Sequence, residues 1–120
     1  MKPRILVADD ETDVCEMIKE YLDERGYEVN IAVDGKTAVH LIEKNPSYAV
    51  AILDENMPGL TGLEVVKYIK VKKLPIKTVL LTAYPEVNEW FSKKVGTDIY
   101  LQKPVDLEKI EKVVRILLEP

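Results

Sequence analysis

The chain has 120 residues, 47% of them hydrophobic and 32% charged, which is typical of one ordinary globular domain and excludes disordered and coiled-coil proteins. Because the net charge is −4, we do not expect the chain to bind nucleic acid directly. No apolar run reaches the roughly 18 residues of a membrane span, and the one cysteine, Cys15, has no disulfide partner, so we expect a single cytoplasmic domain over residues 1–120 that does not contact a membrane.

Short apolar and β-branched runs alternate along the chain with stretches of helical periodicity. These runs predict strands over 5–8, 28–32, 49–53, 77–81 and 99–102. The first, third and fourth runs are almost wholly apolar, as expected for strands buried on both faces, and the second and fifth are expected nearer the edges of the sheet.

Apolar residues recur at helical spacing after each of the predicted strands. The five predicted helix faces are formed by Val14, Met17, Ile18, Tyr21 and Leu22; by Ala38, Leu41 and Ile42; by Leu63, Val66 and Ile69; by Val87, Trp90, Phe91 and Val95; and by Leu107, Ile110, Val114 and Leu117. Gly26 and Gly96 are predicted helix stops. The alternation predicts a doubly wound α/β sandwich of five βα units around a parallel sheet, for which the commonest strand order is 2-1-3-4-5.

Polar residues follow four of the five predicted strands, at the edge where open parallel sheets carry their sites. The segments are Asp9-Asp10-Glu11, Asp54-Glu55-Asn56, Thr82-Ala83 and Lys103-Pro104. With strands one and three as neighbours, Asp9, Asp10 and Asp54 are expected to share one pocket. Carboxylates without nearby histidine or cysteine favour Mg²⁺ over zinc.

The other residues at this edge suggest phosphoryl chemistry. Lys103 offers a positive charge and Thr82 a hydroxyl, which are the groups that position a transferring phosphoryl group and stabilise its charge. An ionised carboxylate can itself attack phosphorus and form an aspartyl phosphate. The residues therefore suggest phosphoryl transfer onto the protein.

Four motifs in this order resemble the receiver domains of bacterial two-component response regulators, which have the CheY-like, flavodoxin-like fold. They are Val7-Ala8-Asp9-Asp10-Glu11, Leu53-Asp54-Glu55-Asn56-Met57-Pro58-Gly59, Leu81-Thr82-Ala83-Tyr84 and Tyr100-Leu101-Gln102-Lys103-Pro104. The resemblance covers essentially the whole chain. It implies that Asp54 is the phosphoacceptor, and that Mg²⁺ is bound by Asp54, directly by Asp10, through water by Asp9 and by the backbone carbonyl of Asn56. It also implies that Thr82 and Lys103 contact the phosphoryl oxygens, that the Lys103–Pro104 bond is cis, and that Tyr100 is the switch aromatic.

The same resemblance implies a signalling role. The phosphoryl donor would be a histidine kinase or a histidine phosphotransfer protein. Phosphorylation would move Thr82 and Tyr100 and change the surface of the fourth helix, fifth strand and fifth helix, which contacts a downstream output protein or domain or a second copy in a phosphorylation-dependent homodimer. Such a domain catalyses only its own phosphorylation and dephosphorylation. One departure concerns the stretch between Thr82 and Lys103, which is one residue shorter than in most relatives and leaves the geometry of the fourth helix open.

Two other functions fit the same fold. A Mg²⁺-dependent phosphatase with an aspartyl nucleophile usually carries a second aspartate two residues later, where this chain has Asn56. An interaction module that works without phosphorylation would be expected to lack residues of the pocket, and here they are all present in the sequence.

Overall fold

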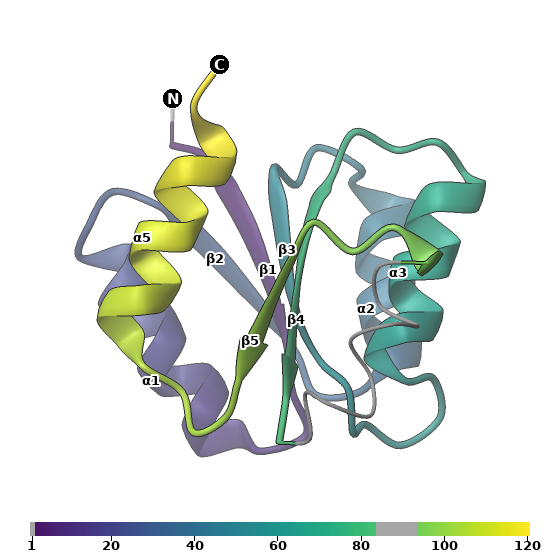
Figure 1. Cartoon of the computed structure of the whole chain (residues 1–120), viewed down its shortest axis with the longest axis horizontal. Helices are drawn as coiled ribbons and strands as arrows, with labels where there is room; N and C mark the ends of the chain where they lie inside the picture. The colour runs from purple at the N-terminus through teal and green to yellow at the C-terminus, as the bar shows by residue number, and fades with distance from the viewer. Residues whose placement is uncertain (1, 84–93) are drawn as a thin grey trace.

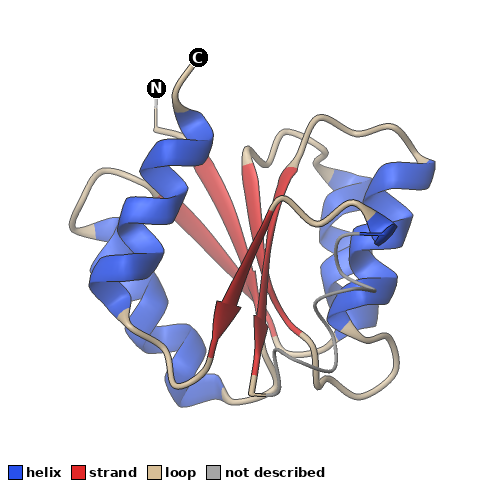
Figure 2. Ribbon diagram, viewed as in Figure 1, coloured by secondary structure: helices blue, strands red, loops and turns tan. Residues whose placement is uncertain are grey.

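The computed structural model describes residues 2–83 and 94–120. Five strands form one parallel sheet in the order β2-β1-β3-β4-β5. Their bounds are β1 Arg4–Ala8, β2 Glu28–Ala32, β3 Val50–Asp54, β4 Lys77–Thr82 and β5 Ile99–Gln102. The helices in the described residues are α1 Thr12–Asp23, α2 Gly35–Lys44, α3 Gly62–Val71 and α5 Leu107–Leu118. Helices α1 and α5 cover one face of the sheet, and α2 and α3 cover the other (Figures 1 and 2). The doubly wound α/β architecture and the strand order are as predicted.

The bounds of three strands differ from the prediction, and β1 begins one residue early, at Arg4. Strand β3 is shifted by one residue and ends at Asp54, which pairs with Leu81, and β4 extends to Thr82, which pairs with Gln102. The apolar runs in the sequence end one residue before the strands do. A polar residue at the end of a strand can keep its main-chain hydrogen bonds while its side chain leaves the core. Asp54 and Thr82 therefore belong to the sheet rather than to the loops that follow it.

The predicted fourth helix falls mostly outside the described residues, because Val87, Trp90 and Phe91 all lie there. Residues 94–95 are helical, and Gly96 follows them with φ 104°. Gly26, after α1, has φ 94°. Both glycines thus adopt the left-handed conformation that commonly follows the end of a helix, as the sequence predicted.

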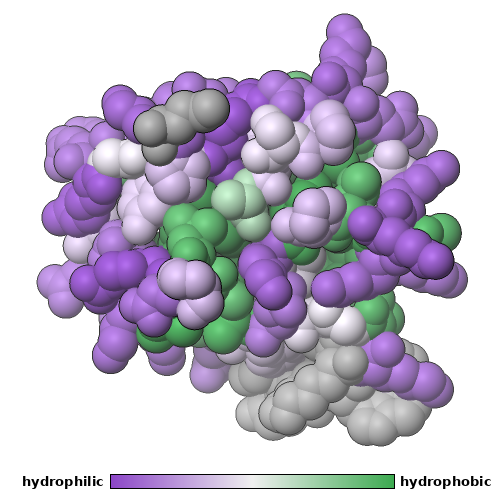
Figure 3. All heavy atoms as spheres, turned by 90° about the horizontal axis from the view of Figure 1, so that it is seen from above, coloured by the Kyte–Doolittle hydropathy of each residue, from purple (hydrophilic) through white to green (hydrophobic). Residues whose placement is uncertain are grey.

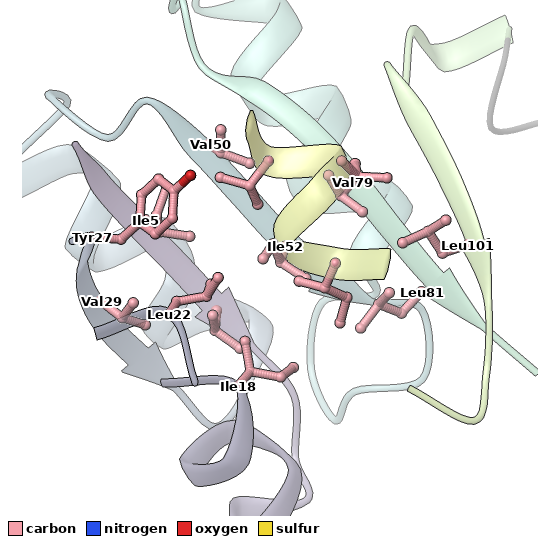
Figure 4. Packing of buried hydrophobic residues seen from close by; sticks show 14 of the residues in the cluster. Ile5, Ile18, Leu22, Tyr27, Val29, Val50, Ile52, Val79, Leu81 and Leu101 are labelled. Atoms are coloured by element: carbon pink, nitrogen blue, oxygen red, sulfur yellow. The ribbon is translucent and has the colours of Figure 1, made fainter. Parts of the chain in front are cut away.

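The core consists of two layers, one on each face of the sheet. Side chains alternate along β1, so Ile5 and Val7 belong to the layer under α1 and α5, and Leu6 and Ala8 to the layer under α2 and α3. Figure 4 shows the first layer, which contains residues of all five strands together with Ile18 and Leu22 of α1. Strands β1, β3 and β4 are buried almost throughout, as expected for strands covered on both faces.

Close backbone contacts set the position of α3 beside the end of β3. A Cβ atom on Gly62 would lie 2.6 Å from the carbonyl oxygen of Asp54 and 2.7 Å from Leu80 Cδ1. Thr61 caps the helix, with its hydroxyl accepting from the Glu64 N–H and its own N–H donating to the Glu64 carboxylate. The first turn of α3 is therefore fixed directly against Asp54.

Both ends of the chain lie at the end of the sheet where the strands begin (Figure 1). Seen from that side, hydrophobic residues gather in the middle of the surface and hydrophilic ones surround them (Figure 3). The polar segments predicted from the sequence lie at the opposite end. Among the helices of residues 2–83 and 94–120, none combines the length and apolar character needed to cross a membrane.

Candidate functional site

A cavity of about 470 Å³ opens at the carboxyl ends of the strands. Its lining residues are Asp10, Glu11, Asp54, Glu55, Asn56, Thr82, Ala83 and Lys103. They come from β3, from the end of β4 and from the segments that follow β1, β3, β4 and β5. The four polar segments of the sequence therefore meet in one place, as the strand order predicted.

Three carboxylates form an acidic cluster here, in which Asp10 and Asp54 line the cavity and the buried Asp9 lies beside them. One oxygen from each of Asp9, Asp10 and Asp54 lies within 4.8 Å of the other two. Asp9 is 0% exposed and Asp54 is 3% exposed, whereas Asp10 is open to solvent. Asp9 is held in place because its amide donates to the Ala32 carbonyl at 3.1 Å and its Oδ1 accepts from the Glu11 N–H at 2.9 Å.

Lys103 reaches into the cluster from the end of β5. Its Nζ lies 3.0 Å from Asp54 Oδ1, 3.3 Å from Asp9 Oδ2 and 3.3 Å from Glu11 Oε1. Its amide donates to the Thr82 carbonyl at 2.8 Å, and the Lys103–Pro104 bond is cis, as expected. The side chain thus contacts two buried carboxylates and one exposed carboxylate at once.

Burial and the ion pairs change the pKa values of these groups. Burial raises the pKa of Asp54 to about 6, although the hydrogen bond and charge of Lys103 oppose the change. Burial also raises the pKa of Asp9, against the opposing hydrogen bond from the Glu11 N–H. For Lys103, burial lowers the pKa, but the hydrogen bond to Asp54 and the charges of Asp54 and Asp9 outweigh this effect and leave the pKa above its ordinary value. The three groups therefore form one strongly interacting set.

The donor set fits a hard divalent cation. Among the described residues no donor is placed to hydrogen-bond to the buried Oδ2 of Asp9, although Lys103 Nζ lies 3.3 Å from it. An oxygen buried without a hydrogen bond is costly unless cations compensate its charge, and the Lys103 ammonium does so only in part, because it also contacts Asp54 and Glu11. Carboxylate and carbonyl oxygens with open positions for water are the ligands that Mg²⁺ prefers. Asp9, Asp10, Asp54 and the Asn56 carbonyl are therefore compatible with a Mg²⁺ site.

Thr82 lines the cavity, whereas Tyr100 does not. Thr82 is 3% exposed and ends β4. Tyr100 pairs with Leu80 in the ladder between β4 and β5 and packs, partly buried, against the hydrophobic layer under α2 and α3. A switch role for Tyr100 therefore stays a prediction.

The pocket contains two acidic residues to which the sequence analysis assigned no role. Glu11 contacts Lys103, and Glu55 accepts a hydrogen bond from the Leu63 N–H at 3.0 Å. Both residues stand next to the predicted aspartates, and that proximity is the only signal in the sequence. Their partners are fixed by the tertiary fold.

Comparison with known proteins identifies the family. The family model described as "Response regulator receiver domain" matches residues 5–115. The chain is 37% identical over 116 residues to the transcriptional regulatory protein TctD of Salmonella typhimurium, covering 96% of this chain and 51% of that protein. It therefore spans about half the length of this curated relative.

Solved structures give the same result. The receiver domain of Francisella response regulator 1452 superposes with a TM-score of 0.91 at 33% identity, covering 97% of this chain and 96% of that one. The response regulator TrrA of Thermotoga maritima, solved in complex with Mg²⁺-BeF, is 40% identical with a TM-score of 0.87, covering 98% of this chain and 100% of that one. The polar pocket, the strand order and these similarities lead to one conclusion: the chain belongs to the receiver domain family of two-component response regulators.

Proposed function

We propose that this receiver domain, taken over residues 1–120 as one unit, is a switch operated by phosphorylation of Asp54. The observation that carries the proposal is the position of the Asp54 carboxylate, which lines the cavity and is buried beside Asp9, Asp10 and Lys103. The donor of the phosphoryl group is a histidine kinase or a histidine phosphotransfer protein. We place the protein in the cytoplasm, and we expect no direct contact with nucleic acid or membrane.

Phosphoryl transfer begins with attack by an Asp54 carboxylate oxygen on phosphorus. The new O–P bond forms as the bond from phosphorus to the donor's histidine nitrogen breaks, and the electron pair of that bond returns to the imidazole. Asp54 then carries a mixed anhydride. Asp9, Asp10, Asp54 and the Asn56 carbonyl would hold Mg²⁺, which supplies positive charge to the phosphoryl oxygens when bound.

Lys103 and Thr82 have the right chemistry to bind the transferred group. The Lys103 ammonium, 3.0 Å from Asp54 in this structure, would contact a phosphoryl oxygen once Asp54 has reacted, because the phosphoryl oxygens then carry the negative charge. The Thr82 hydroxyl would donate to another oxygen. Both contacts exist only in the phosphorylated form, so they bias the equilibrium between two conformations.

The proposed output follows from the movement of these side chains. A displacement of Thr82 at the end of β4 would reach Tyr100, whose ladder partner Leu80 lies two residues before Thr82. The surface of the fourth helix, β5 and α5 would then change its contacts with an output protein or domain or with a second copy of the chain. The predicted fourth helix falls mostly outside the described residues, and β5 and α5 belong to the described part of this surface.

The test is intact-mass analysis after incubation with Mg²⁺ and acetyl phosphate. We expect the addition of one phosphoryl group, which disappears in Asp54→Asn and in the presence of a chelator. Asp13→Asn is the matched control, because Asp13 is an exposed carboxylate in the first turn of α1, and this variant should still be modified. Modification that survives in Asp54→Asn would overturn the assignment of the phosphoacceptor.

Two further outcomes would point to the other functions. An unmodified mass under all conditions would favour an interaction module independent of phosphorylation. Continuous release of phosphate from unrelated phosphate monoesters, far beyond one equivalent, would identify a phosphatase.

A further inference from the structure

Glu55 stands between the proposed phosphoacceptor and Asn56, and its side chain is bound to the start of α3. We infer that Glu55 is a positioning residue, which holds the segment after β3 so that the Asn56 carbonyl is presented to Mg²⁺. The inference rests on the proposed function, because it assigns a task within the same Mg²⁺ site. It is carried by the hydrogen bonds of Glu55 and by the close packing around it.

Three hydrogen bonds fix Glu55 to two different elements. Its amide donates to the Leu81 carbonyl of β4 at 2.9 Å. Its carbonyl accepts from the Gly62 N–H at 3.3 Å, and its Oε1 accepts from the Leu63 N–H at 3.0 Å. The backbone is therefore tied to β4 on one side and to α3 on the other, immediately before Asn56.

The far end of the same segment is held separately. Thr61 and Glu64 form the reciprocal capping contacts of α3, at 2.9 Å and 3.2 Å. Leu60 packs so closely against Gly35 that a Cβ atom on this glycine would overlap the Leu60 carbonyl. These contacts lie four or more residues beyond Asn56, so they fix the start of α3 without directly fixing the Asn56 carbonyl.

The side chain of Glu55 suits this place for two reasons. The first N–H groups of a helix have no partner within the helix, and a carboxylate beside them also interacts favourably with the helix dipole. Glutamate has the length to reach Leu63 from the end of β3, whereas aspartate is one methylene shorter. The side chain is half-buried and lines the cavity, so the bond forms at the edge of the proposed Mg²⁺ site.

A cap of α3 and a positioning residue predict different measurements. A cap contributes only to the free energy of unfolding, whereas a positioning residue also changes the affinity for Mg²⁺. Glu64→Ala is the matched control, since it removes one carboxylate acceptor from the same end of α3. Glu55→Gln keeps the acceptor and removes the charge, and Glu55→Asp keeps the charge and shortens the reach.

The experiment is titration of the whole chain with MgCl₂, followed by calorimetry and by the NMR shift of the Asn56 amide. We expect Glu55→Ala and Glu55→Asp to weaken Mg²⁺ binding roughly tenfold, as is typical when a group that orients a metal ligand is removed. Glu55→Gln and Glu64→Ala should bind Mg²⁺ as the original chain does. Urea unfolding of each variant measures the stability loss, which Glu55→Ala and Glu64→Ala should share.

Each alternative result is decisive. Unchanged Mg²⁺ affinity in the Ala and Asp variants would reduce Glu55 to a helix cap. Equal weakening in Ala and Gln, with Asp unaffected, would assign the effect to charge and overturn the positioning role. Absence of Mg²⁺ binding by the original chain would instead contradict the proposed function. If Glu55→Ala fails to fold, Glu55→Asp and Glu55→Gln still distinguish reach from charge.

Discussion

The Lys103 ammonium lies 3.0 Å from Asp54 Oδ1, and it contacts Asp9 and Glu11 as well. One cation thus partly compensates a group of carboxylates that includes two buried ones. Their mutual repulsion and burial make the pocket unfavourable for folding, while the same features set the electrostatic surroundings of Asp54, the proposed phosphoacceptor. The stability of the chain and the chemistry of the pocket are therefore expected to oppose each other.

Replacing Lys103 with alanine should destabilise the metal-free chain. The change leaves Asp9 and Asp54 buried without the cation that contacts both, and we expect a loss on the order of 2 kcal/mol at pH 7. Urea unfolding in the presence of a chelator measures it. Lys109→Ala, at an exposed position of α5, is the control and should unfold like the original chain. Equal unfolding free energies for the two variants would contradict the prediction.

Replacing Asp54 with asparagine should stabilise the metal-free chain in a way that depends on pH. Burial raises the pKa of Asp54 to about 6 from an ordinary value of 3.8, so the folded chain binds more protons than the unfolded one between these values. Stability from this group is complete below about pH 4 and falls as the pH rises through about 6. The advantage of Asp54→Asn should therefore grow from about 0.5 kcal/mol at pH 4 to about 3 kcal/mol at pH 7.

Thermal and urea unfolding of both proteins in chelator, at several pH values, tests this dependence. A difference between them that stays constant from pH 4 to pH 7 would show that the Asp54 carboxylate does not have the raised pKa. Added Mg²⁺ should stabilise the original chain more than the Asn variant, because Asp54 is one of the proposed ligands.

Gly62→Ala should destabilise the chain, although alanine usually stabilises a helix relative to glycine. Propensity alone favours alanine over glycine by about 1 kcal/mol, but the new Cβ would lie 2.6 Å from the Asp54 carbonyl oxygen. We expect a net loss of about 2 kcal/mol, since the end of β3 is buried and cannot yield freely. Urea unfolding measures whether the free energy of unfolding falls or rises in the variant.

Gly26→Ala is the comparison for this variant. Gly26 has φ 94°, and a Cβ atom added there would meet no neighbouring atom within 4 Å, so only backbone strain of about 1 kcal/mol applies. Phosphorylation of Asp54 should be slowed in Gly62→Ala and unchanged in Gly26→Ala. A more stable Gly62→Ala variant would show that α3 can move away from Asp54 at little cost.

Cys15 should be unreactive in the folded chain. Its side chain is 0% exposed and its Sγ donates to the Asp9 carbonyl at 3.2 Å. Burial, followed by the charge of Asp9, raises the pKa of the thiol to about 11, so little thiolate forms near pH 8. Intact-mass analysis after treatment with iodoacetamide should show modification only in urea. Rapid labelling under native conditions would contradict the packing of α1 against the end of β1.

Most of the fold could be predicted from the sequence because apolar runs of strand length alternate regularly with stretches of helical periodicity. The sequence also predicted that Asp9, Asp10, Asp54, Thr82 and Lys103 meet, since parallel strands bring their carboxyl ends to one edge. Burial of the central strands and exposure of the edge strands followed from composition alone.

Other features depended on information that no local pattern contains. The apolar run before Asp54 does not reveal that the hydrogen-bonded ladder includes this residue, because pairing is determined by Leu81 of the neighbouring strand. Likewise, the contact of Glu11 with Lys103 depends on the reach of two side chains from distant segments. The roles of individual residues, Tyr100 among them, need the experiments above.

The two chain ends lie near each other at the end of the sheet where the strands begin, which is opposite to the pocket (Figure 1). A fluorophore, an affinity handle or a tether to a sensor chip attached at either end would thus leave the acidic opening free to face the solution. Immobilised in this orientation, the domain could be presented to candidate kinases without steric interference from its own attachment.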